Sequence, residues 1–179
     1  ARTADVRLDG VVVATDAVIG DPAHGLPVLE RAVDEAIAAI CAEAVGAMDA
    51  ALRLTVEHLK TRVQFDRPIG SFQALQHRAA DMFVAVEQAR SMALWATMAV
   101  GEDDDAVRRR AMSAAKVQIS KSARFVGQQA IQLHGGIGMT WEYAVGHLFK
   151  RLTMIDKQFG DLDHHLDRLA AGDGLIEAA

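Results

Sequence analysis

The chain has 179 residues, of which 51% are hydrophobic and only 5% aromatic, and it carries a formal net charge of −5. A chain of this length can build one domain with a real core, and its acidic balance argues against nucleic acid or an anionic membrane as the main partner. Its one cysteine, Cys41, excludes an internal disulfide framework and a cysteine-based metal site.

The apolar residues are mainly Ala, Val, Leu, Ile and Met, a composition that favours helices over sheets. No apolar run approaches the roughly 20 residues that are needed to span a bilayer. The N-terminus also lacks a signal-peptide pattern. We therefore expect a cytoplasmic protein without a membrane span.

The first 25 residues differ in pattern from the rest of the chain. Residues 4–13 alternate apolar and polar side chains, and Asp9-Gly10 is a hairpin-type turn signal. Two short strands cannot make a stable sheet by themselves. We therefore predict that residues 1–20 are the end of a larger β-domain and that residues 20–25 form a linker.

Helical periodicity begins near Leu26, where apolar residues recur mostly at the helical spacing. Pro68-Ile69-Gly70 interrupts the pattern, Ser71 is a candidate N-cap for the second helix, and the acidic loop 101–105 can cap the third. The predicted helices are 26–62, 72–100, 106–133, 141–153 and a last one that is capped by Asp161 and ends near the glycines of 172–174.

These segments predict an all-α fold, an antiparallel bundle of long helices preceded by a short β remnant. Residues 26–171 would form the bundle domain and residues 172–179 a tail. The basic side chains of the third helix are expected to form a solvated face; they are Arg108, Arg109, Arg110, Lys116, Lys121 and Arg124.

Two motifs stand out on this framework. The stretch 131–140 ends the third helix and holds three glycines within four positions, and glycines let a backbone approach a ligand closely. A glycine cap at a helix end would explain only one of them. The second stretch, 62–73, reads Arg-Val-Gln-Phe-Asp-Arg-Pro-Ile-Gly-Ser-Phe-Gln.

Together the two motifs resemble the C-terminal domain of acyl-CoA dehydrogenases, over nearly the whole chain, and residues 1–20 look like the end of that family's middle β-domain. The resemblance implies that the helical domain packs against a second subunit and supplies residues to FAD at the interface. Arg62 matches the arginine that holds the flavin pyrophosphate, where a planar cationic fork suits two phosphates. The other implied cofactor-binding positions are Phe65, Gln73, Gln132, Leu133, His134, Gly135 and Gly136.

The resemblance fails at the catalytic base. Members of the family remove an α-proton from an acyl-CoA thioester with a glutamate, while a hydride leaves the β-carbon for the flavin. The position that matches this glutamate is Phe159, and the position that a minority of the family uses instead is Ala36. Glu35 and Glu43 are the remaining candidates. Burial of Glu43 among its apolar neighbours would raise its pKa, and the alternative is a paired, partly exposed carboxylate.

The coenzyme A contact is also altered. Asp34 matches a family acid, but the arginine that contacts the CoA moiety three residues later is Ile37 here. Loss of both the base and this anchor favours a base-lacking partner of a catalytic chain, most like the small subunits of pimeloyl-CoA-type dehydrogenases. A catalytic subunit with a displaced base stays open, as does the choice between a homo-oligomer and a hetero-oligomer.

The activity that the resemblance implies is α,β-dehydrogenation of an acyl-CoA to a trans-2-enoyl-CoA, with electrons passing to an acceptor of the electron-transfer flavoprotein type. The sequence does not specify the acyl group, although the apolar side chains of Val33, Ile37 and Ile40 favour an uncharged acyl segment. The N-terminal helical domain and most of the β-domain of the family are missing from the chain, so we expect no activity from it alone.

Two other classes compete with this interpretation. One is a structural or oligomerising bundle that binds no flavin, and the other is a carboxylate-bridged metal bundle, which would need Glu-x-x-His motifs that the sequence lacks. In the segment 161–167 carboxylates and imidazoles are adjacent rather than one helical turn apart, so it reads as a polar helix start and not as a metal site. His134 can touch cofactor or pack, and Trp141 and Tyr143 are expected to anchor the next helix.

Overall fold

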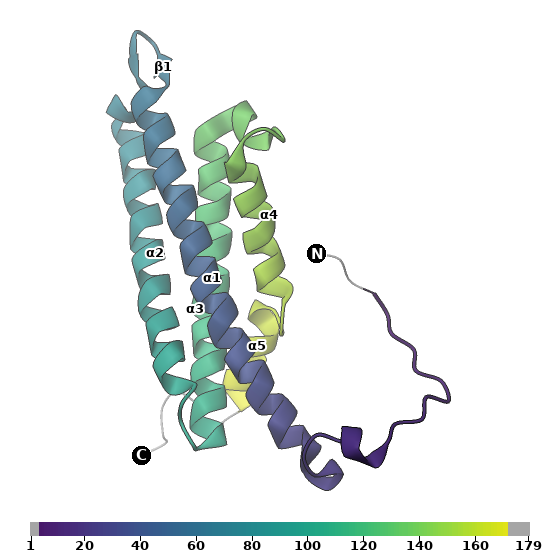
Figure 1. The fold of residues 1–179 in the computed structure, drawn as a ribbon. Helices are drawn as coiled ribbons and strands as arrows, with labels where there is room; N and C mark the ends of the chain where they lie inside the picture. Colours follow the sequence, from purple (N-terminus) through teal and green to yellow (C-terminus); the bar gives the residue numbers. More distant parts are fainter. Residues whose placement is uncertain (1–3, 172–179) are drawn as a thin grey trace, which may run out of the picture.

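The computed structural model describes residues 4–171, which form an all-α bundle with one very small sheet (Figure 1). The long helices α1 (Gly25–Thr61), α2 (Gln73–Ala99) and α3 (Asp105–His134) pack side by side. Helix α4 (Ala144–Lys157) packs against α3 and α1, and the short α5 (Leu162–Ala171) packs against α3. The remaining elements are η1 (Thr15–Ala17), η2 (Pro22–His24), β1 (Val63–Gln64), β2 (Arg67–Pro68), η3 (Ile69–Ser71) and η4 (Gly135–Met139).

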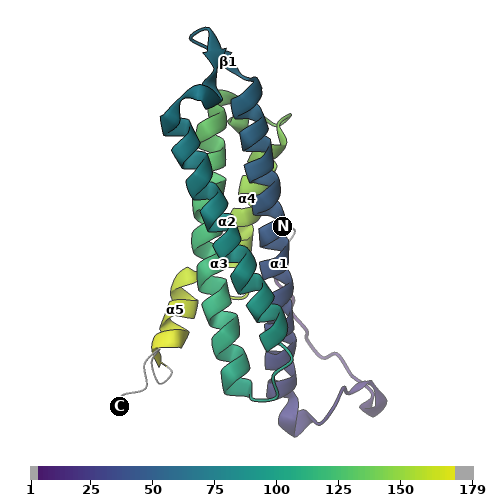
Figure 2. The ribbon, with the colours of Figure 1, turned by 90° about the vertical axis from the view of Figure 1, so that its left-hand side faces the viewer.

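Two features mark the opposite ends of the bundle. The antiparallel hairpin β1–β2 joins α1 to α2 at one end, and α5 lies toward the other (Figure 2). Because α3 runs back toward the hairpin, the C-terminal ends of α1 and α3 lie at the same end of the molecule (Figure 1). The motif 62–73, which follows α1, and the motif 131–140, which ends α3, therefore lie at the same end of the bundle.

The core is built largely from small side chains. Among the described residues, 12 of the 26 buried hydrophobic residues are alanines, and they lie along α1, α2 and α3. Alanine has the highest helix propensity, and its small side chain lets neighbouring helix axes approach closely. Larger side chains such as Ile37, Met48, Met82 and Met112 fill the space between these contacts.

The predicted helices are confirmed, with ends that differ by one to four residues. Asp104 caps α3, since its carboxylate accepts from the backbone N–H groups of Ala106 and Val107 at 2.8 and 3.2 Å. Asp161 accepts from the backbone N–H of His164 at 3.1 Å, as expected for the cap of α5. The prediction for Ser71 was wrong, because its hydroxyl donates to the carbonyl of Pro68 inside η3.

Residues 4–13, whose pattern predicted strands at the end of a larger sheet, form no strand in this structure. Residues 4–24 are exposed and extend away from the bundle (Figure 1). A strand needs a hydrogen-bonded neighbour, and the described part of the chain offers none here. The backbone of residues 4–13 is irregular here, and the assignment of residues 1–20 to the end of a larger β-domain stays a prediction; residues 1–3 and the predicted tail, 172–179, lie outside the described residues.

The prediction that the basic side chains of α3 form a solvated face was wrong for two of them. Arg110, Lys121 and Arg124 are exposed, but Arg108 and Lys116 are only 1% and 0% exposed. Arg108 donates to Asp34 on α1 at 3.0 Å and to the carbonyl of Glu102 at 2.8 Å. Both buried cations therefore have partners from segments that are distant in the sequence.

Among residues 4–171, no helix combines sufficient length with sufficient apolarity to cross a membrane.

Candidate functional site

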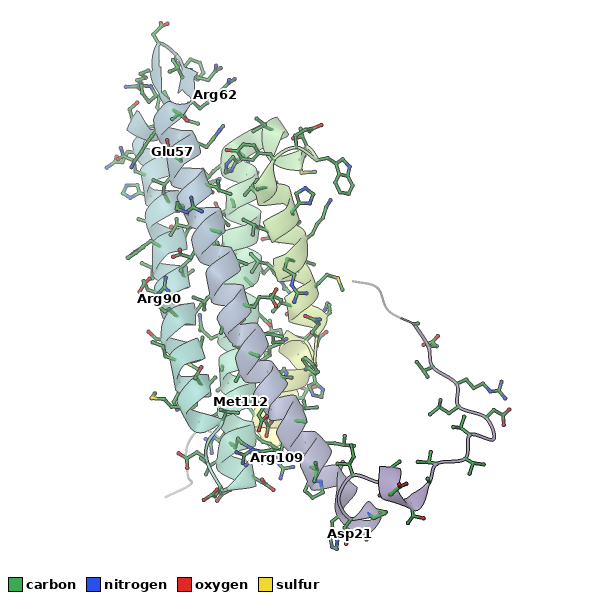
Figure 3. The ribbon with its side chains drawn as sticks, viewed as in Figure 1. Asp21, Glu57, Arg62, Arg90, Arg109 and Met112 are labelled. Carbon is green, nitrogen blue, oxygen red and sulfur yellow. The ribbon has the colours of Figure 1, made fainter. Side chains whose placement is uncertain are left out.

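Arg62 lies at the point where α1 gives way to the hairpin. Its backbone is extended, with φ −72° and ψ 120°, and its N–H donates to the carbonyl of His58 at 2.9 Å. Its own carbonyl accepts from Ile69 at 2.8 Å, which closes the base of the hairpin. The side chain is exposed at the tip of the bundle (Figure 3). The guanidinium is thus free of the core and accessible to an anionic ligand.

The hairpin presents an aromatic side chain beside this arginine. Phe65 and Asp66 both have positive φ, 55° and 60°, as in the tight turns that match strand twist. Phe65 is 84% exposed and meets the edge of Phe72 at a ring-centroid distance of 6.0 Å. Arg67 lies over the other aromatic ring, 4.1 Å from the centroid of Phe72. Phe65 is therefore held away from the core on a short, ordered support.

The start of α2 is fixed against α1 by a glycine. A Cβ at Gly70 would lie 2.8 Å from the carbonyl oxygen of Leu59, so only glycine permits this approach. Gln76 donates to the carbonyl of Gly70 at 2.8 Å and secures the turn. Gln73, the first residue of α2, is exposed on the same part of the surface as the hairpin base.

The second motif closes α3 with a glycine cap. Gly135 has φ 65° and ψ −144°, a backbone conformation that is open essentially only to glycine, and its N–H donates to carbonyls of the last helical turn. Nothing lies within 4 Å of a Cβ placed on Gly135 or Gly136, so the backbone there borders open space. Gln132 is exposed, whereas Leu133 and His134 point inward and are 6% and 5% exposed. A ligand can therefore reach Gln132 and the glycine backbone, but not the side chain of Leu133.

Two stacked imidazoles connect the motifs. The rings of His58 on α1 and His134 on α3 lie 4.5 Å apart at 28°, and Tyr143 meets the His134 ring at 5.0 Å. His134 Nδ1 donates to the carbonyl of Ala130 at 2.8 Å. Burial lowers the pKa of both histidines, and the neighbouring His134 and Arg62 lower that of His58 further. His134 therefore packs the two helix ends together as a neutral ring.

The carboxylates that could replace the missing base are poorly suited to that role. Glu43 is exposed, contrary to the burial considered from its neighbours, and its oxygens accept from Arg151 at 2.5 and 2.6 Å. This pairing lowers the pKa of Glu43, whereas a base buried in an apolar site would have a raised one. Glu35 is exposed and pairs with Arg31 at 3.4 Å. Neither arrangement resembles a poised general base.

We expect the substitution Glu43→Gln to leave the turnover of the assembled enzyme unchanged. An exposed ion pair contributes about 0 to 1 kcal/mol, so the free energy of unfolding should fall by no more than that. Steady-state kinetics with an acyl-CoA and thermal unfolding would measure the two effects. A large loss of turnover without loss of flavin would instead identify Glu43 as the base.

At the other end of the bundle a groove of about 380 Å³ lies between the first turns of α1, the start of α3 and α5. Its apolar wall includes Leu26, Leu29 and Val33, and its basic wall includes Arg109 and Arg168. Arg109 also pairs with Glu30 at 3.0 Å. The groove could not be predicted from the sequence, because its residues come from three separate elements; of them, only Val33 was expected to line a site.

Ile37 is fully buried in the core and cannot line a ligand site, and Ala36 is half-buried beside it. Tyr143 forms the N-terminal boundary of α4, while Trp141 is 74% exposed and stacks under the ammonium of Lys150 at 3.9 Å. No group of three or more metal-ligating side chains occurs within residues 4–171, which includes the segment 161–167.

Comparison with known proteins agrees with this description. Residues 23–172 match the model of the acyl-CoA dehydrogenase C-terminal domain. Acyl-CoA dehydrogenase IpdE2 of Mycobacterium tuberculosis is 46% identical over 118 residues, which are 66% of this chain and 35% of that protein. The chain therefore spans about a third of the length of this relative.

Solved structures give the same result. A glutaryl-coenzyme A dehydrogenase in complex with glutaryl-CoA superposes with a TM-score of 0.85 and 26% identity, over 96% of this chain and 43% of that one. The ChsE4–ChsE5 complex of Mycobacterium tuberculosis superposes with a TM-score of 0.68 and 26% identity, over 77% and 37%. The chain belongs to the acyl-CoA dehydrogenases, a family of FAD-dependent oxidoreductases, and corresponds to their C-terminal domain.

Proposed function

We propose that this chain is the C-terminal part of an acyl-CoA dehydrogenase subunit that supplies its hairpin end to the flavin of a catalytic partner and has no base of its own. The reaction is α,β-dehydrogenation of an acyl-CoA to a trans-2-enoyl-CoA, with electrons passing to an acceptor of the electron-transfer flavoprotein type. The observation that carries the proposal is the separation of two surfaces at opposite ends of the bundle.

The distance between these surfaces follows from helix geometry. Ala36 and Arg62 are separated by 26 residues of α1, or roughly 39 Å at 1.5 Å per residue. Figure 3 places Arg62 and Arg109 at the two ends accordingly. We infer that the hairpin end and the groove of one chain serve different flavins, in an oligomer with cofactors at its interfaces.

The accessible groups at the hairpin end fit a dinucleotide. The fork of Arg62 can bind two phosphate oxygens at once, and the open backbone at Gly135 and Gly136 can contact the adenosine half. Gln132 and Gln73 add exposed amides at the same end, and Phe65 adds an exposed aromatic face. When FAD is bound, it supplies the acceptor for the hydride; the residues named here only bind and orient it.

The groove at the other end fits an amphipathic thioester. Apolar side chains line one wall, and the guanidinium groups of Arg109 and Arg168 can bind an anionic group such as a coenzyme A phosphate. No carboxylate is present at Ala36 or at Phe159, the two positions where the family places its base. The groove is also lined by Glu30 and Asp34, which pair with Arg109 and Arg108, so neither is free to remove an α-proton from a bound acyl-CoA.

A heteromer explains how such a chain takes part in catalysis. One of the similar structures is a complex of two named chains, ChsE4 and ChsE5, so related folds do assemble with a different partner. In such an assembly the partner provides the glutamate, and this chain completes the partner's cofactor site with Arg62 and the glycine motif. An inert bundle would not need an exposed arginine, glutamines and open glycine backbone at one end.

The decisive experiment uses the full-length parent protein, purified alone and together with the related chain that co-purifies with it. We expect yellow protein, with flavin absorbance that an acyl-CoA bleaches, only when both chains are present. A Glu→Gln change at the partner's base should abolish bleaching, because this chain has no carboxylate in its place.

Two outcomes would contradict the proposal. Bleaching of flavin by the parent protein alone would mean that it is a catalytic homomer with a displaced base. A colourless protein in every combination would mean that the bundle is a structural module. Flavin content by absorbance and subunit composition by mass spectrometry distinguish these results.

A further inference from the structure

Lys116 lies in the middle of α3 with its side chain fully buried. Its ammonium donates to the carbonyl of Asp156 at 3.0 Å and to the carbonyl of Gly160 at 2.8 Å. These carbonyls lie on either side of the turn between α4 and α5. Burial lowers the pKa of Lys116, whereas the nearby carboxylate of Asp156 raises it. Burying an ammonium group costs free energy unless it is hydrogen-bonded, and both hydrogen bonds of Lys116 go to this turn. We therefore take the fixing of the turn as the role of Lys116.

His165 on α5 holds the same turn from a second direction. It is fully buried, and its Nε2 lies 3.0 Å from the carbonyl of Phe159. A carbonyl only accepts, so Nε2 carries the proton, and Nδ1 accepts from the hydroxyl of Ser113 on α3 at 3.2 Å. Burial and the charge of Lys116 lower the pKa of His165 to about 4, so the ring stays neutral. Lys116 thus fixes the carbonyls of residues 156 and 160, and His165 fixes that of residue 159.

The turn itself could not keep this shape unaided. Phe159 has φ 57°, which an L side chain rarely adopts, and Gly160 has φ 97°. A Cβ at Gly160 would lie 2.3 Å from the ring of His164, so only glycine fits between the turn and that ring. His164 is one of the residues that line the groove between α1, α3 and α5. The turn and the groove wall are therefore in direct contact.

We propose that Lys116 and His165 are positioning residues for the acyl-CoA groove, which hold the turn 158–160 against His164 and thereby fix the shape of the groove. This inference rests on the proposed function, since it takes the groove as an acyl-CoA site. The pair touches no substrate; it acts through the turn. Lys116 and His165, which we call the clamp, also hold Phe159, the residue that matches the position of the family's base. The side chain of Phe159 is 44% exposed.

The test uses the full-length protein assembled with its partner and compares wild type with Lys116→Met, which keeps the length of the side chain and removes the ammonium. We expect amide hydrogen exchange in residues 158–162 to accelerate at least about tenfold and the dissociation constant of an acyl-CoA to rise about tenfold, the scale of a lost charged hydrogen bond. Flavin content should not change, because the hairpin end is remote.

The matched control is Lys121→Met, the same change at an exposed position of α3, which should alter neither quantity. If Lys116→Met does not fold, His165→Phe removes the second set of contacts while keeping a ring, and the same two measurements apply. Unchanged exchange or unchanged acyl-CoA affinity in a folded variant would overturn the inference. Absence of acyl-CoA binding to wild type would overturn the proposed function instead, while the exchange measurement would still report on the clamp.

Discussion

Replacing Arg62 with alanine should release flavin from the assembled enzyme. Truncating one partner of a buried, hydrogen-bonded charge pair costs roughly 2 to 5 kcal/mol, so the dissociation constant of FAD should rise about 30-fold or more. The structure gives the reason why folding should be unaffected: the side chain is exposed, and only its backbone takes part in the hairpin. Flavin retained after gel filtration and fluorescence titration of the apoprotein would measure the loss.

Two companion variants sharpen this result. Arg62→Lys keeps the charge but loses the planar fork, so flavin affinity should lie between wild type and the alanine variant. Arg53→Ala removes an exposed arginine from α1 before the hairpin and should leave affinity unchanged. Equal flavin content in Arg62→Ala and Arg53→Ala would show that the hairpin end does not bind the cofactor.

The second large effect concerns stability. Asp34→Ala should lower the free energy of unfolding by about 2 to 3 kcal/mol, because it leaves the buried guanidinium of Arg108 without one of its two carboxylates. Both side chains are only 2% exposed, and the nitrogen and oxygen lie 3.0 Å apart. We place the effect at the low end of the range for buried pairs, since Asp105 still bonds Arg108 and the pair lies near one end of the bundle. Thermal or urea unfolding would measure it.

The control for this prediction is an exposed pair on the same bundle. Asp49→Ala removes a carboxylate that accepts from Arg90 at 2.9 Å but is 55% exposed, and it should cost no more than about 1 kcal/mol. Replacing both members of the buried pair, Asp34→Ala with Arg108→Met, should recover part of the lost stability because no charge is then stranded. A cost for Asp34→Ala no larger than for Asp49→Ala would contradict this account.

The helices were predictable from the sequence because their signals are local. Apolar spacing, Asp104, Asp161 and the glycine after His134 act within a few residues of the boundaries that they set. The fate of charged residues was not predictable in this way. Arg108 meets Asp34 across 74 positions, and Arg151 meets Glu43 across 108. Periodicity alone cannot reveal such partners.

The candidate site also has parts that local sequence signals predict and parts that depend on the tertiary fold. Both motifs were located from the sequence, and the antiparallel order of the helices brings the C-terminal ends of α1 and α3 together, as a shared cofactor surface requires (Figure 1). Which residues of the second motif face outward was not foreseen, since Leu133 and His134 turn into the core where α3 ends. The groove could not be predicted because Arg109 and Arg168 form one wall only when α3 and α5 pack together in the folded chain.

The alanine-rich core has a consequence for which substitutions the domain tolerates. In a core of leucines, the common damage is truncation, which leaves a cavity. Here nearly half of the described buried apolar positions already carry alanine, so there is little left to truncate along the contacts between α1, α2 and α3. Added volume is the greater hazard, because each extra methylene must push two backbones apart, at a cost of about 1 to 3 kcal/mol. Sequence drift in this bundle is therefore limited more by crowding than by loss of packing.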